Sequence, residues 1–174
     1  MNDASEKKYA SDRILEKIGR RREREMLVGG EEEKTKVVIF SLHGDLYAFS
    51  GESIKELLPP LPVYSVPGTP DFIPGVINVR GQIESVLNIN RFLGLSDSKG
   101  SQSGRIALAE KDGIRSGVLV DSVEDVADIP VNSIKPPLNI LSTAIKEFVS
   151  GEFVYHDKLI IMLDIGRIFR KIAR

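Results

Sequence analysis

The sequence contains no cysteine, and aromatic residues make up only 6% of its 174 positions. The absence of cysteine excludes disulfide scaffolds, thiolate zinc sites and cysteine nucleophiles. Few aromatic side chains and a net charge of -1 provide neither a stacking platform nor a phosphate track. We therefore expect no nucleic-acid partner.

Long apolar runs are also absent. No run approaches the ~20 residues that a membrane-spanning helix needs, and the charged N-terminus lacks the apolar segment of a signal peptide. We expect a cytoplasmic protein without direct membrane insertion, and the lack of cysteine agrees with a reducing compartment.

The residue patterns of catalysis are missing as well. The two histidines, His43 and His156, fall in predicted hairpin turns, where a histidine is usually a solvated polar residue. No Gly-x-Ser-x-Gly elbow occurs, and the glycines from Gly75 to Gly81 lack the lysine and Ser/Thr of a phosphate loop. We expect no enzymatic activity, no metal site and no cofactor.

Charge dominates the start of the chain. Residues 1–36 carry ten Lys/Arg and nine Asp/Glu, including the run Arg20-Arg21-Arg22. Ile14, Leu15 and Ile18 form a short apolar cluster at helical spacing, which would suit a helix that binds a partner. The charge density instead favours a mobile, solvated N-terminal tail over residues 1–35.

From Lys36 onward, short alternating apolar runs are separated by turn signals, a pattern typical of an all-β barrel or sandwich. Two short helices are expected in addition. The first begins after Asn88 and ends at Gly94, and the second begins after Asp164 and runs through Ile172. Asn88 and Asp164 are the expected N-caps.

These helix starts belong to an internal repeat. Leu87-Asn88-Ile89-Asn90-Arg91-Phe92 corresponds to Leu163-Asp164-Ile165-Gly166-Arg167-Ile168, and Ser53-Ile54-Lys55-Glu56-Leu57 corresponds to Ser122-Val123-Glu124-Asp125-Val126. We predict a mainly β fold of two pseudo-symmetric five-stranded barrels on a shared core, with short helices closing each repeat. Residues 36–174 would form one domain with interleaved barrels. Each repeat half, around 36–95 and 104–173, would form one barrel, with a groove between the two.

The run Gly75-Val76-Ile77-Asn78-Val79-Arg80-Gly81 brings polar residues together. On a strand, Ile77 and Val79 share one face while Asn78 and Arg80 share the other, and Gly81 suits a tight turn. The arrangement fits either a solvated sheet face or a surface presented to a partner. Spacing alone favours the solvated face.

The same run resembles a known family. Together with Pro70-Asp71-Phe72-Ile73-Pro74, Leu87-Asn88-Ile89 and Phe92-Leu93-Gly94-Leu95, it is similar to the central signature of CheW, the chemotaxis coupling protein. Further matches lie at Ile39-Phe40-Ser41-Leu42, Tyr47-Ala48-Phe49, Gly117-Val118-Leu119-Val120-Asp121-Ser122-Val123 and Leu159-Ile160-Ile161-Met162-Leu163-Asp164-Ile165. The resemblance covers about residues 36–172 in family order.

The resemblance implies two binding surfaces. Family members bind the cytoplasmic tip of methyl-accepting chemoreceptors, and the matching positions here are Gly75, Asn78 and Arg80, with Glu56 facing the arginine. They also bind the regulatory domain of the histidine kinase CheA, for which Val38 and Ile54 are the matching candidates. From the residues alone, a core position is favoured for Val38 and Ile54, as it is for Val63.

The implied function is a non-enzymatic scaffold or adaptor that couples chemoreceptors to a CheA-type histidine kinase in chemotaxis signal transduction, associated with membrane-bound receptor arrays. Glu84 stands where the family commonly has an apolar residue, and Gly51 replaces a larger one. Two alternatives stay open. One is a coupling protein of a non-flagellar chemosensory pathway that governs surface motility or development, and the other is a small-ligand sensor that uses the groove between the barrels.

Overall fold

The computed structural model describes residues 32–96, 104–137, 141 and 143–173. A compact unit comprises Lys34–Arg174. In the described part of the chain, no helix is long and apolar enough to cross a membrane. Of the predicted tail, residues 1–35, the first 31 residues lie outside the described residues.

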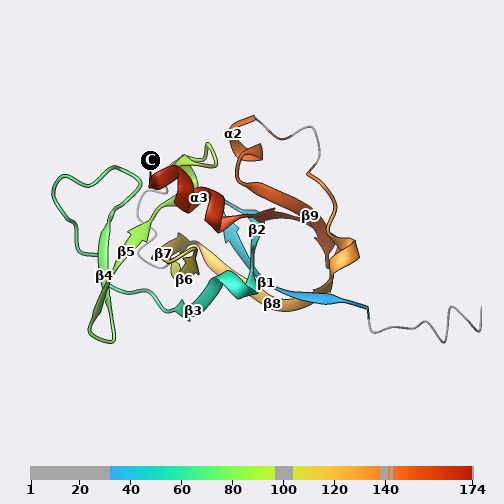
Figure 1. Ribbon diagram of the computed structural model, residues 1–174, viewed down its shortest axis with the longest axis horizontal. Coiled ribbons are helices and arrows are strands. Elements are labelled where there is room, and N and C mark those ends of the chain that lie inside the picture. Colours follow the sequence, from blue (N-terminus) through green and yellow to red (C-terminus); the bar gives the residue numbers. More distant parts are fainter. Residues whose placement is uncertain (1–31, 97–103, 138–140, 142, 174) are drawn as a thin grey trace, which may run out of the picture. The chain divides into compact units, whose positions relative to one another are not determined.

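The first sheet has five strands in the order β8-β1-β2-β10-β9. Figure 1 labels β8, β1, β2 and β9 of this sheet. Its strands are β1 (Lys34–Leu42), β2 (Asp45–Ser50), β8 (Ser122–Pro130), β9 (Val149–Tyr155) and β10 (Lys158–Leu163). β1 is buried on both faces, because Val37 and Ile39 join one apolar cluster while Phe40 and Leu42 join another. This explains why the apolar run in β1 is continuous rather than alternating.

The second sheet has five strands in the order β3-β6-β7-β5-β4. Its strands are β3 (Ile54–Leu58), β4 (Gly75–Val79), β5 (Gln82–Leu87), β6 (Arg105–Lys111) and β7 (Ile114–Val120). A separate apolar cluster fills the interior of this sheet and includes Ile77, Val86 and Leu108, each 0% exposed.

The internal repeat relates the two sheets. Exchanging β1 to β5 with their counterparts β6 to β10 converts one strand order into the other. The matched segments 53–57 and 122–126 correspond to the starts of β3 and β8. Each of these is an edge strand, and each pairs with the first strand of the other repeat: β3 with β6, and β8 with β1. The predicted pseudo-symmetry is confirmed.

The expectation that each repeat half forms its own barrel was wrong. Each sheet takes strands from both halves, because β2 pairs in parallel with β10 and β5 pairs in parallel with β7. The alternation of apolar residues determines which face of a strand is buried, but not which strand lies beside it. In the described ranges, the two edge strands of each sheet form no ladder with each other, so each barrel is open along one seam.

Both predicted N-caps are present. Asn88 Oδ1 accepts a hydrogen bond from Asn90 N at 3.1 Å, and Asp164 Oδ1 accepts one from Arg167 N at 3.2 Å. The first capped segment is only a 3-10 turn, η2 (Ile89–Arg91), whereas the second is the helix α3 (Ile165–Ile172). The other short helices are η1 (Gly51–Ser53), η3 (Val131–Ser133) and α2 (Thr143–Lys146).

α3 contributes to the core that the two sheets share. Phe169 of α3 packs in one cluster with Phe40 and Phe49 of the first sheet and with Leu87 and Val118 of the second. Full burial of each such side chain contributes about 1.5 to 3 kcal/mol. The short C-terminal helix is therefore held by tertiary packing.

Deleting residues 1–31 is expected to change the thermal midpoint by less than about 2 °C. The compact unit from Lys34 has three apolar clusters of its own, and the composition of residues 1–31 offers little to bury. Melting curves of the full chain and of residues 32–174, followed by circular dichroism, measure the difference. A fall of many degrees would contradict the prediction.

Candidate functional site

The β4–β5 hairpin has one buried face and one presented face. Ile77 and Val79 point inward and are 0% and 5% exposed, as the alternation predicts. Arg80, however, lies beyond the end of β4 in a two-residue turn with Gly81, and both residues have positive φ, 52° and 87°. The prediction that strand alternation places Arg80 was therefore wrong, because the tight turn that Gly81 permits begins one residue earlier.

Asn78 helps to order this turn. Its Oδ1 accepts a hydrogen bond from Gly81 N at 2.7 Å, while the residue is exposed on the strand. The side-chain oxygen thus satisfies a backbone donor of the hairpin. The Nδ2 group of Asn78 could donate to a partner that approaches the same face.

Glu56 and Arg80 are in contact, as the family resemblance implies. Arg80 Nη2 donates to Glu56 Oε1 at 2.6 Å, and the two side chains are 79% and 30% exposed. An exposed ion pair of this kind contributes about 0 to 1 kcal/mol to stability. β3 and β4 are the two edges of the second sheet, so the pair spans the open seam and limits where the guanidinium can point.

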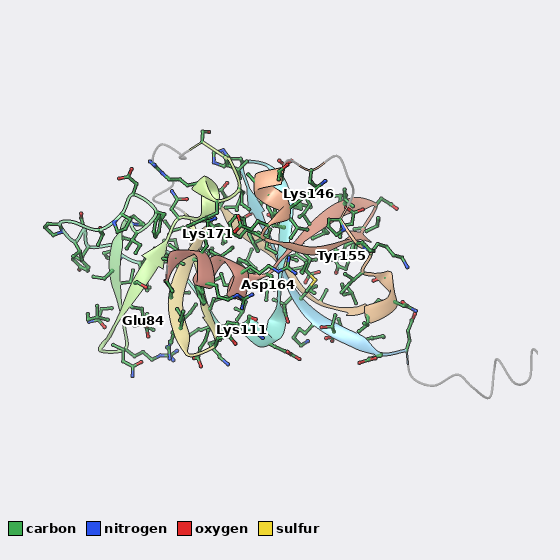
Figure 2. All side chains as sticks on the ribbon, turned by 45° about the horizontal axis from the view of Figure 1, so that its top comes forward. Glu84, Lys111, Lys146, Tyr155, Asp164 and Lys171 are labelled. Atoms are coloured by element: carbon green, nitrogen blue, oxygen red, sulfur yellow. The ribbon has the colours of Figure 1, made fainter. Side chains whose placement is uncertain are left out.

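The first sheet has a counterpart of this pair. Asp125 faces Ile39 in β1 as Glu56 faces Leu108 in β6, and Asp125 accepts a hydrogen bond from Tyr155 Oη at 2.6 Å across the seam. That bond, together with a weaker effect of the Val126 N–H, lowers the pKa of the Asp125 carboxyl, and the same bond raises the pKa of the Tyr155 hydroxyl. Glu84 and Tyr155, labelled in Figure 2, mark the two corresponding hairpins.

Gly75, one of the predicted receptor-binding residues, begins β4. It is buried, and a Cβ atom added to it would lie 2.1 Å from the carbonyl oxygen of Tyr64. The close approach permits two backbone hydrogen bonds between Tyr64 and Val76, at 2.8 and 2.9 Å. Gly75 therefore allows a preceding loop to dock against the edge of β4.

A groove of about 210 Å³ lies next to this hairpin. It is lined by Ile73, Ser85, Leu87, Ile114, Ser116, Phe169, Ile172 and Ala173. The hydroxyls of Ser85 and Ser116 bond to each other at 2.8 Å, which satisfies polar atoms within an otherwise apolar lining. The sequence predicted a groove between the barrels but not these lining residues, which come from β5, β7, α3 and its C-terminal end and, in the case of Ile73, from the loop before β4.

The outer face of the hairpin, which carries Val76, Asn78, Ile83 and Ser85, leads from the groove to the turn. Directly opposed residues of an antiparallel pair lie on the same face, and Asn78 is opposed to Ile83. Ile83 is 65% exposed, whereas the neighbouring Glu84 points inward and pairs with Arg115 at 2.9 Å. The alternation of side chains along β5 could have indicated that Ile83 lies on the exposed face.

The two kinase-surface candidates lie in different environments. Val38 is 4% exposed in β1 and is paired with Phe49 on one side and Val126 on the other, so it is not at a strand edge. The structure supports the interpretation of Val38 as a core residue, because β8 of the second repeat pairs with β1 on the side opposite β2. Ile54 is half-buried at the start of the edge strand β3 and packs against the shared core.

Comparison with known proteins identifies the family. The sequence pattern described as CheW-like domain matches residues 36–173, most of the chain. The chain belongs to the CheW-like domain family. The chemotaxis protein CheW of Thermotoga maritima is 31% identical over 138 residues, which are 79% of this chain and 89% of that protein. Protein PilI of Pseudomonas aeruginosa is 26% identical over 114 residues, which are 66% of this chain and 64% of that protein.

A solved structure agrees with this assignment. The crystal structure of the scaffolding protein TtCheW from Thermoanaerobacter tengcongensis has a TM-score of 0.68 and 34% identity, covering 76% of this chain and 90% of that one. As a CheW-like protein, the chain is a scaffold of chemotaxis signalling and not an enzyme. Its histidines lie in hairpin turns, and no cluster of three or more His, Asp or Glu residues that could hold a metal ion occurs among the described residues.

Proposed function

We propose that this CheW-like protein couples the cytoplasmic tip of a methyl-accepting chemoreceptor to the regulatory domain of a CheA-type histidine kinase. It would act in the cytoplasm, in arrays associated with the receptors. The observation that carries the proposal is the exposed Arg80, oriented by Glu56 at 2.6 Å, at the turn of the β4–β5 hairpin whose outer face carries the apolar Val76 and Ile83. A cation and an apolar strip together suit a helix surface that carries both carboxylates and aliphatic side chains.

The receptor-binding surface in this proposal comprises Asn78, Arg80, the strip at Ile83 and the adjacent groove. Arg80 can donate several hydrogen bonds in one plane to carboxylate or carbonyl oxygens of the receptor. Glu56 occupies only part of the guanidinium, because the side chain of Arg80 remains 79% exposed. Gly75 contributes indirectly, by holding the preceding loop against β4.

The kinase-binding surface in this proposal is centred on Ile54 and lies on another edge strand. Ile54 opens β3, directly after the short turn that contains Gly51. Val38 would act from the interior, by supporting the sheet on which a partner rests. Separate surfaces for receptor and kinase are what a coupling protein needs, because both partners must be held at once.

Replacing Arg80 with alanine is expected to weaken receptor binding roughly ten- to a hundredfold, because an oriented charge-assisted hydrogen bond contributes about 1.5 to 3 kcal/mol. Stability should change little, since only an exposed ion pair is lost. The measurement is a pair of titrations, one against a receptor tip fragment and one against the kinase regulatory domain. Kinase binding is expected to stay at the wild-type level.

The matched control is Lys158→Ala. Lys158 is an exposed cation that follows the turn His156–Asp157 in the corresponding hairpin, so its removal changes net charge equally. It should leave both titrations unchanged. Unchanged receptor affinity in the Arg80→Ala protein, or an equal loss toward both partners, would contradict the proposal.

A further inference from the structure

The loop between β3 and β4 exposes an aromatic residue. Tyr64 lies in residues 59–74, which contain six of the nine prolines of the chain, and its surface is 62% exposed. Figure 1 shows this loop, between β3 and β4, at the left of the view. A single exposed aromatic residue is ordinary, but one that adjoins other exposed apolar side chains such as Ile83 can mark a binding surface.

The loop is held in place by hydrogen bonds. Tyr64 N donates to Val76 O at 2.8 Å, and Val76 N donates to Tyr64 O at 2.9 Å. Farther along, Thr69 Oγ1 donates to Val66 O at 2.9 Å and lies 3.1 Å from Ile73 O. These bonds and the fixed φ angles of the prolines reduce the entropy that Tyr64 would lose on binding a partner.

The backbone pairing also determines the direction of the side chain. Tyr64 and Val76 form an antiparallel bridge, so their side chains lie on the same face. Val76 shares that face with Asn78 along β4, and Asn78 is opposed to Ile83 of β5. Tyr64 therefore extends the outer face of the hairpin on the side away from β5.

We propose that Tyr64 is a specificity-determining contact for the chemoreceptor, a role that rests on the proposed function. Tyr64 lies beside Val76, Ile83 lies diagonally across from Val76 on the same face, and Asn78 and Arg80 provide donors next to Ile83 and at the turn. The matching partner is a receptor helix with aliphatic residues on one stripe and a carboxylate or free carbonyl next to them. Tyrosine suits such a contact, because it brings a large apolar area with few rotatable bonds.

The test compares two substitutions at this position in the chain of residues 1–174. Tyr64→Ser removes the ring and is expected to weaken binding of a receptor tip fragment about tenfold, whereas Tyr64→Phe keeps the ring and should stay within about twofold. Both should bind the kinase regulatory domain normally and should melt within about 2 °C of the wild type. The matched control is Val154→Ser, at a residue 67% exposed on β9 in the other sheet, which should leave receptor binding unchanged.

The Arg80→Ala protein separates the two hypotheses. If Arg80→Ala weakens receptor binding and Tyr64→Ser does not, the role of Tyr64 is refuted while the proposed function stands. Equal losses for Tyr64→Ser and Val154→Ser would also refute it, because the effect would then not depend on position. If the wild-type protein fails to bind the receptor fragment, the proposed function is wrong and the role of Tyr64 falls with it.

Discussion

Replacing Gly75 with alanine is expected to destabilise the protein by about 2 to 4 kcal/mol. The new Cβ would lie 2.1 Å from the carbonyl oxygen of Tyr64 and 2.6 Å from its carbonyl carbon, and the φ angle of 155° is unfavourable for a side chain. Rotation of a side chain cannot relieve this clash, because both atoms belong to the backbone. The loop has to move, and the two hydrogen bonds between Tyr64 and Val76 are lost.

Urea denaturation of the Gly75→Ala protein measures this cost. Gly81→Ala is the matched control, because Gly81 has a φ angle of 87° but nothing within 4 Å of an added Cβ. The Gly81→Ala protein has backbone strain but no clash, so its free energy of unfolding should fall by only about 1 kcal/mol. Equal stability of the two variants would show that the loop relaxes freely. In the folded fraction, the displaced Tyr64 should also weaken receptor binding, which ties the stability effect to the proposed contact.

The sequence was sufficient for the pseudo-symmetric part of the fold. The repeated helix starts at Asn88 and Asp164 rely on local capping, which depends on neighbouring residues alone, and both caps form. The pairing of strands could not be predicted in the same way. β1 gains β8 as a neighbour only through tertiary assembly, and this neighbour is what buries Val38.

The candidate site shows the same division. The contact between Glu56 and Arg80 was predicted from the resemblance and is present. Tyr64 could not be predicted, because its direction depends on one backbone bridge to Val76 rather than on any periodic pattern. The role of Gly75 depends on the same bridge, which sequence spacing does not encode. Nor did spacing show that the carboxylate of Glu84 is turned inward to Arg115.

Val38 and Ile54 differ in burial, and the same substitution to glutamate should therefore affect their folding differently. Val38 is 4% exposed between two strands, so a glutamate there would place a carboxylate in the interior. An unpaired buried charge costs several kcal/mol, a large share of the 5 to 15 kcal/mol that typically stabilises a domain. Ile54 is half-buried at the start of an edge strand, where a carboxylate can turn toward water.

We therefore expect Val38→Glu to be largely unfolded, whereas Ile54→Glu stays folded, loses about 1 to 2 kcal/mol of stability and binds the kinase regulatory domain at least tenfold more weakly. Circular dichroism and titration against that domain measure both effects. Val126→Glu controls for the substitution itself, because Val126 is the strand partner of Val38 but is 45% exposed, and it should cost about 0.5 kcal/mol or less. A folded Val38→Glu protein would contradict its place in the core. A folded Ile54→Glu protein that binds the kinase normally would show that the kinase contacts a different surface, because the altered residue would then lie outside the interface.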